Sequence, residues 1–155
     1  MTGRYASQTS VGADRTRSEI ERTLKRYGAT SFAYGWEASG ALIGFKAHGR
    51  MIRMRLAFPV LEEFYKTPKG RKRSKVAALK EHEQATRSLW RALLLIIKAK
   101  LEAVAAGVST FEEEFMAFIA LPDGSTVGEF MAPQISAAYK TGRMPPLLGA
   151  PKEAQ

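Results

Sequence analysis

The sequence predicts an α+β fold in which a three-stranded antiparallel meander packs on one long helix. Three stretches between residues 31 and 58 alternate apolar and polar side chains, as half-buried strands do. Residues 75–107 follow with strong helix formers, no proline and a glycine only at the end. The expected order is α-β-β-β-α, followed by two short C-terminal helices.

Residues 1–13 are rich in Ser, Thr and Gly, and they are expected to form a flexible N-terminal arm. A single domain is expected over 14–142, with a Pro-rich tail over 143–155. The first helix is expected to begin near Asp14 or Ser18, which can cap it, and to end at Gly28. Its buried face carries apolar residues at helical spacing, namely Ile20, Leu24 and Tyr27.

The three strands are expected at 31–37, 41–47 and 50–58, with a tight hairpin at His48-Gly49. In the first strand, Phe32, Tyr34 and Trp36 share one face. They have two interpretations: a core stripe, or a platform on which bases stack, with Tyr34 or Trp36 the exposed member. The third strand has an apolar face (Ile52, Met54, Leu56, Phe58) and an opposite face with Arg53 and Arg55.

Apolar residues at helical spacing form one stripe along the long helix, namely Trp90, Leu93, Ile97, Leu101 and Val104. The apolar residues 94–96 widen this stripe beyond a single face. Its middle is therefore expected to be buried by the sheet and by another helix or a second subunit, so a homo-oligomer is one expectation. A short helix capped by Ser109 or Thr110 follows. The last helix opens with the cap pattern Thr126 to Glu129 and contains Pro133, which is expected to kink it or to begin its second half.

The charge is distributed unevenly along the chain, whose net charge is +9. Residues 1–107 hold 21 Lys and Arg against 9 Asp and Glu, a net +12. Residues 108–155 hold 3 against 6, a net −3. A positively charged region attracts polyanions, and nucleic acid is the commonest polyanion in a cytosol. An acidic protein or an anionic lipid would also be attracted to it.

The densest positive charge lies in "KTPKGRKRSK", residues 66–75, between the third strand and the long helix. Pro68 and Gly70 favour a loop, and Ser74 can cap the helix. One interpretation is a loop that contacts phosphates; the other is a solvated linker. The candidate nucleic-acid-binding residues are Lys66, Lys69, Arg71, Lys72, Arg73 and Lys75, with Arg53 and Arg55.

Little in the sequence supports catalysis, so a non-enzymatic protein without cofactor or metal is expected. The chain has no cysteine, no HExxH, no Walker-type loop and no GxSxG. His48 and His82 are expected at the surface, and no carboxylates are spaced as a pair. The first residues lack the apolar stretch of a signal peptide, and no apolar run could span a bilayer, so a cytoplasmic location without membrane contact is expected.

Several motifs together cover most of the chain: "RYASQTSV", "SEIERTLKRYGA", "RALLLIIKAKLEAV", "LPDGSTVGEFMAPQI" and "GRMPPLL". In these the chain resembles small proteins of unassigned function that are encoded in tailed-phage and prophage genomes. The resemblance implies a bacterial host cytoplasm, but no activity and no site residues. The element order is also similar to that of double-stranded-RNA-binding domains, although "KGRKRSKVAALKEHE" does not reproduce their motif.

Two functions follow from these observations. The first is a phage accessory protein that binds DNA or RNA mainly through electrostatic phosphate contacts. The alternative is an interaction module that docks on a host or phage protein through its basic face or its long helix.

Overall fold

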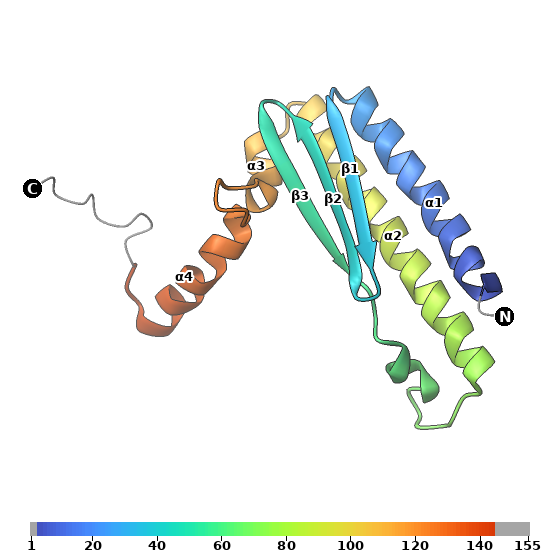
Figure 1. Cartoon of the computed structure of the whole chain (residues 1–155). Coiled ribbons are helices and arrows are strands. Elements are labelled where there is room, and N and C mark those ends of the chain that lie inside the picture. The colour runs from blue at the N-terminus through green and yellow to red at the C-terminus, as the bar shows by residue number, and fades with distance from the viewer. Residues whose placement is uncertain (1–2, 145–155) are drawn as a thin grey trace, which may run out of the picture.

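The computed structural model describes residues 3–144 (Figure 1). The elements, in chain order, are α1 (Gly3–Arg26), β1 (Ser31–Glu37), β2 (Gly40–Ala47), β3 (Arg50–Ala57), the 3-10 turn η1 (Leu61–Tyr65), α2 (Lys75–Ala105), α3 (Phe111–Phe115), the 3-10 turn η2 (Met116–Phe118) and α4 (Val127–Thr141). The predicted α+β class and element order are confirmed. The predicted tail falls almost wholly outside the described residues.

The sheet is an antiparallel meander in the order β1-β2-β3. Tyr34 pairs with Ile43, which pairs with Met54, so these residues share the face that packs on the helices. The hairpin between β2 and β3 turns at His48 and Gly49, whose φ angles are 50° and 71°. Two successive positive φ angles are what a two-residue hairpin of type I′ requires, and the predicted turn is therefore confirmed.

A layer of two helices, α1 and α2, covers one face of the sheet (Figure 1). Lys98 of α2 donates a 2.6 Å hydrogen bond to Glu19 of α1. One turn further along α2, Glu102 accepts a 2.7 Å hydrogen bond from the Tyr27 hydroxyl. Trp90 of α2 is buried between the helices and the sheet. The core of the domain therefore lies between this layer and the inner face of the sheet.

The first helix begins earlier than the sequence suggested. The backbone is helical from Gly3, so the expected start near Asp14 was wrong, and the expected arm over 1–13 is helical from its third residue onward. Asp14 and Ser18 lie inside the helix and do not cap it. The composition of this segment misled the prediction, because one interior glycine costs a helix only about 1 kcal/mol and does not end it. Gly28, at φ 95°, follows the end of α1 as expected.

The two C-terminal helices begin with capping boxes, as their sequences indicated. In α3 the Thr110 side chain accepts from the Glu113 backbone while the Glu113 side chain accepts from the Thr110 backbone, and Thr126 and Glu129 do the same in α4. Pro133 does not divide α4, which is one uninterrupted helix over fifteen residues. Within residues 3–144, no helix combines the length and the apolar character that crossing a membrane requires.

Candidate nucleic-acid interface

The candidate interface is centred on residues 66–75, here called the basic loop, which folds into a tight turn. Lys66 and Lys72 face each other as an isolated antiparallel bridge. Between them, the Thr67 amide donates to the Arg71 carbonyl at 2.8 Å, and the Gly70 amide donates to the Thr67 carbonyl at 2.8 Å. Gly70 has φ 78°, a conformation that glycine adopts without strain. The charged segment is therefore a hydrogen-bonded turn rather than an extended linker.

Two side chains hold the base of the basic loop against the rest of the fold. The Arg73 guanidinium donates to the carbonyl oxygens of Phe64 and Lys66 at 3.2 and 3.0 Å. A ring nitrogen of His82 on α2 lies 2.8 Å from the Pro59 carbonyl oxygen, and the Phe64 ring packs edge-on against the imidazole at 5.6 Å. The loop thus leaves the sheet through η1 and enters α2 at a defined position (Figure 1).

Five of the six cations in the basic loop are exposed: Lys66, Lys69, Arg71, Lys72 and Lys75. The ion pairs of 4.0 Å or less between described residues lie elsewhere in the molecule. Ser74 caps α2 by accepting from the Ala77 amide at 3.2 Å, so the positive end of the helix dipole adds to the field of the loop. These charges repel one another, and a polyanion would relieve that repulsion.

The two strand arginines differ in their surroundings, although both project from the face of β3 that turns away from α1 and α2. Arg53 donates a hydrogen bond to the Gly124 carbonyl and lies 3.5 Å from the Glu129 carboxylate. Arg55 is exposed at the end of β3 from which the chain continues to η1 and the basic loop. The structure therefore leaves Arg55 open to solvent beside the loop end of the sheet, and joins Arg53 to the first turn of α4.

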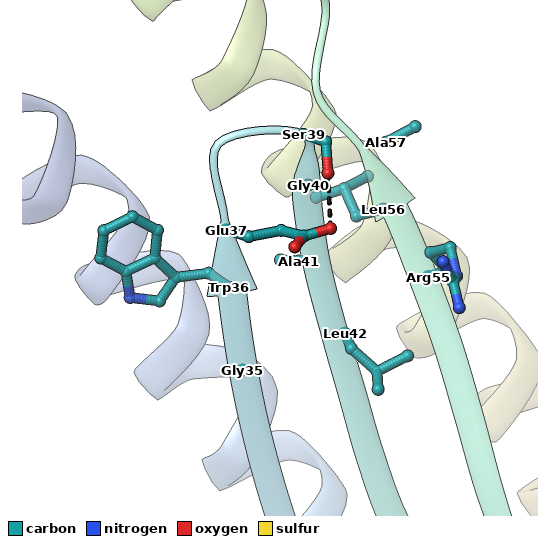
Figure 2. A pocket seen from close by; sticks show the side chains of 10 residues that line it. All are labelled: Gly35, Trp36, Glu37, Ser39, Gly40, Ala41, Leu42, Arg55, Leu56 and Ala57. Atoms are coloured by element: carbon teal, nitrogen blue, oxygen red, sulfur yellow. Dashed lines mark hydrogen bonds between the residues drawn. The ribbon is translucent and has the colours of Figure 1, made fainter.

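A shallow pocket of about 440 Å³ lies at this loop end of the sheet, and Figure 2 shows ten residues that line it. Arg55 and Leu42 project from neighbouring strands on one side of the sheet (Figure 2). Glu37 accepts a 2.6 Å hydrogen bond from Ser39 in the turn between β1 and β2. The pocket lining thus combines one cation and one carboxylate with several apolar side chains.

The aromatic stripe of β1 divides between the two interpretations that the sequence left open. Phe32 and Tyr34 are half-buried against the helices, and the Tyr34 ring lies 6.0 Å from that of Trp90. The Arg17 guanidinium covers Tyr34 at 4.4 Å from its ring centroid. Trp36 is 69% exposed and projects sideways from the edge of β1 (Figure 2). Trp36 is therefore the ring of this stripe that is open to solvent.

The histidines and acidic residues of the described range lie apart from one another or hold local structure. No three His, Asp or Glu side chains there converge as metal ligands. His48 is exposed and stacks on Phe111 at 4.5 Å, whereas His82 is half-buried and supports η1. Glu129 and Asp123 have pKa values below their ordinary range, Glu129 chiefly because it accepts from the Thr126 amide and Asp123 because it accepts from the Ser125 hydroxyl. Both shifts come from hydrogen bonds that shape the start of α4.

Two features of the interface were not anticipated from the sequence. One is the anchoring role of Arg73, which was grouped with the phosphate-binding cations because its charge is the same as theirs. The other is the pocket around Leu42 and Arg55, whose members come from three strands. Finding this pocket requires the pairing register of the three strands, and the alternation of apolar and polar residues does not give that register.

Comparison of the chain with models of known protein families, with curated proteins and with solved structures finds no match. The functional argument therefore depends on the geometry of this chain.

Proposed function

We propose that this protein is a phage accessory protein that binds DNA or RNA, without catalysis, in the cytoplasm of a bacterial host. The phage setting rests on the sequence motifs alone. The observation that carries the binding proposal is the ordered basic loop with its five exposed cations. A turn held by backbone hydrogen bonds presents these cations together, so little conformational entropy is lost when they meet phosphates.

Arg55 and Trp36 extend the proposed surface from the basic loop onto the end of the sheet. Arg55 adds a sixth cation on the solvent-facing side of β3. Trp36 offers an exposed ring on which an unpaired base can stack, a contact worth about 1–3 kcal/mol per base. Arg53 and Arg73 have intramolecular partners, and they support this surface instead of contacting phosphate.

A salt titration of the full chain with four labelled polymers tests the proposal: single- and double-stranded DNA, and single- and double-stranded RNA. The logarithm of the association constant should fall linearly with the logarithm of salt concentration, by about 0.9 per phosphate contact on duplex DNA. Absence of binding to all four polymers at low salt, or a flat salt dependence, contradicts the proposal.

A matched pair of triple variants locates the contact. Replacing Lys69, Arg71 and Lys72 by Gln should reduce the salt slope by about 3. The control variant replaces Arg15, Arg22 and Lys25, which are exposed on α1, by Gln and changes the net charge equally. It should reduce the salt slope by less than about 1. Equal losses in the two variants would mean that overall charge, and not the basic loop, drives binding.

The same basic loop also fits the alternative function, docking on an acidic protein. A pull-down from host lysate, repeated after nuclease treatment, separates the two functions. Under our proposal, partners captured by the intact chain disappear once nucleic acid is digested. A protein that stays bound after digestion, and is lost in the triple loop variant, favours docking.

A further inference from the structure

The pocket at the loop end of the sheet carries a carboxylate and a guanidinium on the same face. Gly35 pairs with Leu42, which pairs with Arg55, and Glu37 lies two residues beyond Gly35. Because side chains two residues apart on a strand share a face, Glu37, Leu42 and Arg55 all project from the side of the sheet that turns away from α1 and α2. Glu37 and Arg55 come from the two outer strands, about 10 Å apart, and Leu42 comes from the strand between them (Figure 2).

The space between these side chains is open because a glycine lies beneath it. A β-carbon at Gly35 would meet no atom of the described residues within 4 Å, so there is room above this residue for a ligand. The pocket has a volume of about 440 Å³, which is within the range of sites that hold small ligands. One nucleotide is a ligand of that size class.

The Glu37 carboxylate is held in place by its neighbour. Ser39, in the turn between β1 and β2, donates a 2.6 Å hydrogen bond to Oε1 of this carboxylate. An ionised carboxylate has about four acceptor sites and no donor, so one such bond leaves it able to accept more. A ligand group that binds here must therefore present donors, and it binds best if two donors lie side by side.

Among the bases, guanine presents that pattern. The N1–H and N2–H groups of its Watson–Crick edge are adjacent donors, and a carboxylate can accept both in a bidentate arrangement. Adenine and cytosine place an acceptor nitrogen beside their amino group, whereas thymine and uracil place a carbonyl on each side of their single N–H. Those acceptors would face a carboxylate oxygen and be repelled. Pairing in a duplex occupies this edge, so only an unpaired guanine can offer it.

We propose that this pocket binds one unpaired guanine of a nucleic-acid strand, an inference that rests on the nucleic-acid binding proposed above. Glu37 accepts from N1 and N2 of the base, and Leu42 packs against the base. Arg55, the cation of the pocket lining, contacts a phosphate of the strand. Trp36, at the rim of the pocket, stacks on the neighbouring base.

The guanine belongs to a strand and not to a free nucleotide. The basic loop lies beyond this end of the sheet (Figure 1), and its exposed cations can contact further phosphates of the same strand. A free guanine nucleotide cannot make those contacts. In this arrangement the basic loop supplies most of the affinity, and Glu37 supplies a preference for one base.

Fluorescence anisotropy of the full chain with labelled single strands of equal length tests the proposal. Four strands compare the bases: thymine alone, and thymine alternating with guanine, adenine or cytosine. The guanine strand should bind about fivefold more tightly than the other three, which is the lower end for a bidentate contact because Glu37 is exposed to solvent. Hypoxanthine in place of guanine lacks only the N2 amino group and should lose most of this preference.

A first pair of variants tests the carboxylate. Glu37→Gln keeps the shape and can still accept from Ser39, but it presents an amide donor to one of the two guanine donors, so the preference should disappear. Glu63→Gln, at an exposed position on η1, removes the same charge outside the pocket and should keep the fivefold preference of about the wild-type size.

A second pair tests the space without changing any charge. Gly35→Val places a side chain in the pocket, suits a strand, and should abolish the preference. Ala33→Val makes a similar change on the same face, two residues earlier and outside the pocket lining, and should leave the preference unchanged. The preference is a ratio of affinities measured on one variant, so an unfolded fraction lowers all four affinities equally and does not alter it.

Two outcomes overturn this inference while the proposed function stands. One is equal binding of the four strands that still weakens steeply with salt. The other is a guanine preference that survives Glu37→Gln or Gly35→Val, which would locate the base contact elsewhere. Absence of binding to every strand at low salt would overturn the proposed function and this inference together.

Discussion

Arg73 donates a hydrogen bond to the backbone carbonyl of Lys66 at 3.0 Å, so one cation of the basic loop is used to hold the first residue of that loop in place. The same guanidinium nitrogen, Nη1, also donates to the Phe64 carbonyl at 3.2 Å. The charge pattern grouped Arg73 with the residues that contact a ligand. The structure shows that Arg73 instead holds the loop that carries the other cations.

We expect Arg73→Ala to make the basic loop more mobile, in addition to removing one positive charge. Losing the two hydrogen bonds should cost about 1 kcal/mol locally, because this side chain is partly exposed. Hydrogen exchange should therefore become faster at the amides of Thr67, Gly70 and Arg71. Lys69→Ala removes one charge without a bond to the scaffold and serves as the control. Unchanged exchange in Arg73→Ala would contradict the anchoring role.

The contact between α1 and α2 should depend on pH through Glu19. The hydrogen bond from Lys98, followed by the charge of Lys98, lowers the pKa of Glu19 below its ordinary value of 4.5. Because the folded-state pKa is the lower one, the stabilisation is complete above pH 4.5 and is lost as the pH falls through the folded-state value. Glu19→Gln should therefore lower the melting temperature at neutral pH, with a difference that shrinks under acid.

A double-mutant cycle with Lys98→Met assigns this effect to the pair. If Lys98 is the cause, Glu19→Gln in the Lys98→Met background should give little further change at neutral pH. Additive losses from the two substitutions would show that Glu19 acts through other neighbours.

Substitution of the two tryptophans should destabilise the fold by very different amounts. Trp90 is 1% exposed and contacts Tyr34 and Phe58, so Trp90→Ala should cost about 3–5 kcal/mol of unfolding free energy. Trp36→Ala, at the exposed edge of β1, should cost less than about 0.5 kcal/mol. Urea unfolding followed by circular dichroism measures both. Similar losses would mean that Trp36 is packed in solution.

Trp36 should also report on single-stranded nucleic acid. In a Trp90→Phe background, the fluorescence comes from Trp36 and should be quenched when a base stacks on its indole. Single-stranded polymers should quench it more than duplexes, whose bases are already stacked. Binding without any quenching would confine the contact to phosphates.

Thr126 should stabilise α4 through its side-chain oxygen. Thr126→Ala removes the acceptor for the Glu129 amide, which lies 3.2 Å away, and should destabilise the helix by about 1 kcal/mol. Thr126→Ser keeps the oxygen and should retain most of the stability. Exchange of the amides in α4 measures the difference locally. Equal exchange in the two variants would argue that packing on η2, and not the cap, sets the stability of this helix.

Much of the fold was accessible from local patterns, for physical reasons that particular residues illustrate. Alternation from Ser31 to Glu37 identified β1, because successive side chains of a strand point to opposite faces. Ser74, Thr110 and Thr126 marked three helix starts, because a side-chain oxygen there accepts an otherwise unpaired amide. The early start of α1 was missed, since residues 3–12 carry no regular apolar stripe in the sequence.

Arg53 and Arg55 show what required the tertiary structure. The sequence by itself determined that both lie on the same face of β3 and that the basic segment joins this strand to a long helix. It could not determine which arginine is free, because the partners of Arg53, Gly124 and Glu129, lie some seventy residues further along the chain. The spacing of residue types within a segment predicts where strands, helix caps and turns form. The partner of a side chain depends on which distant segment folds beside it, and that is a property of the assembled domain.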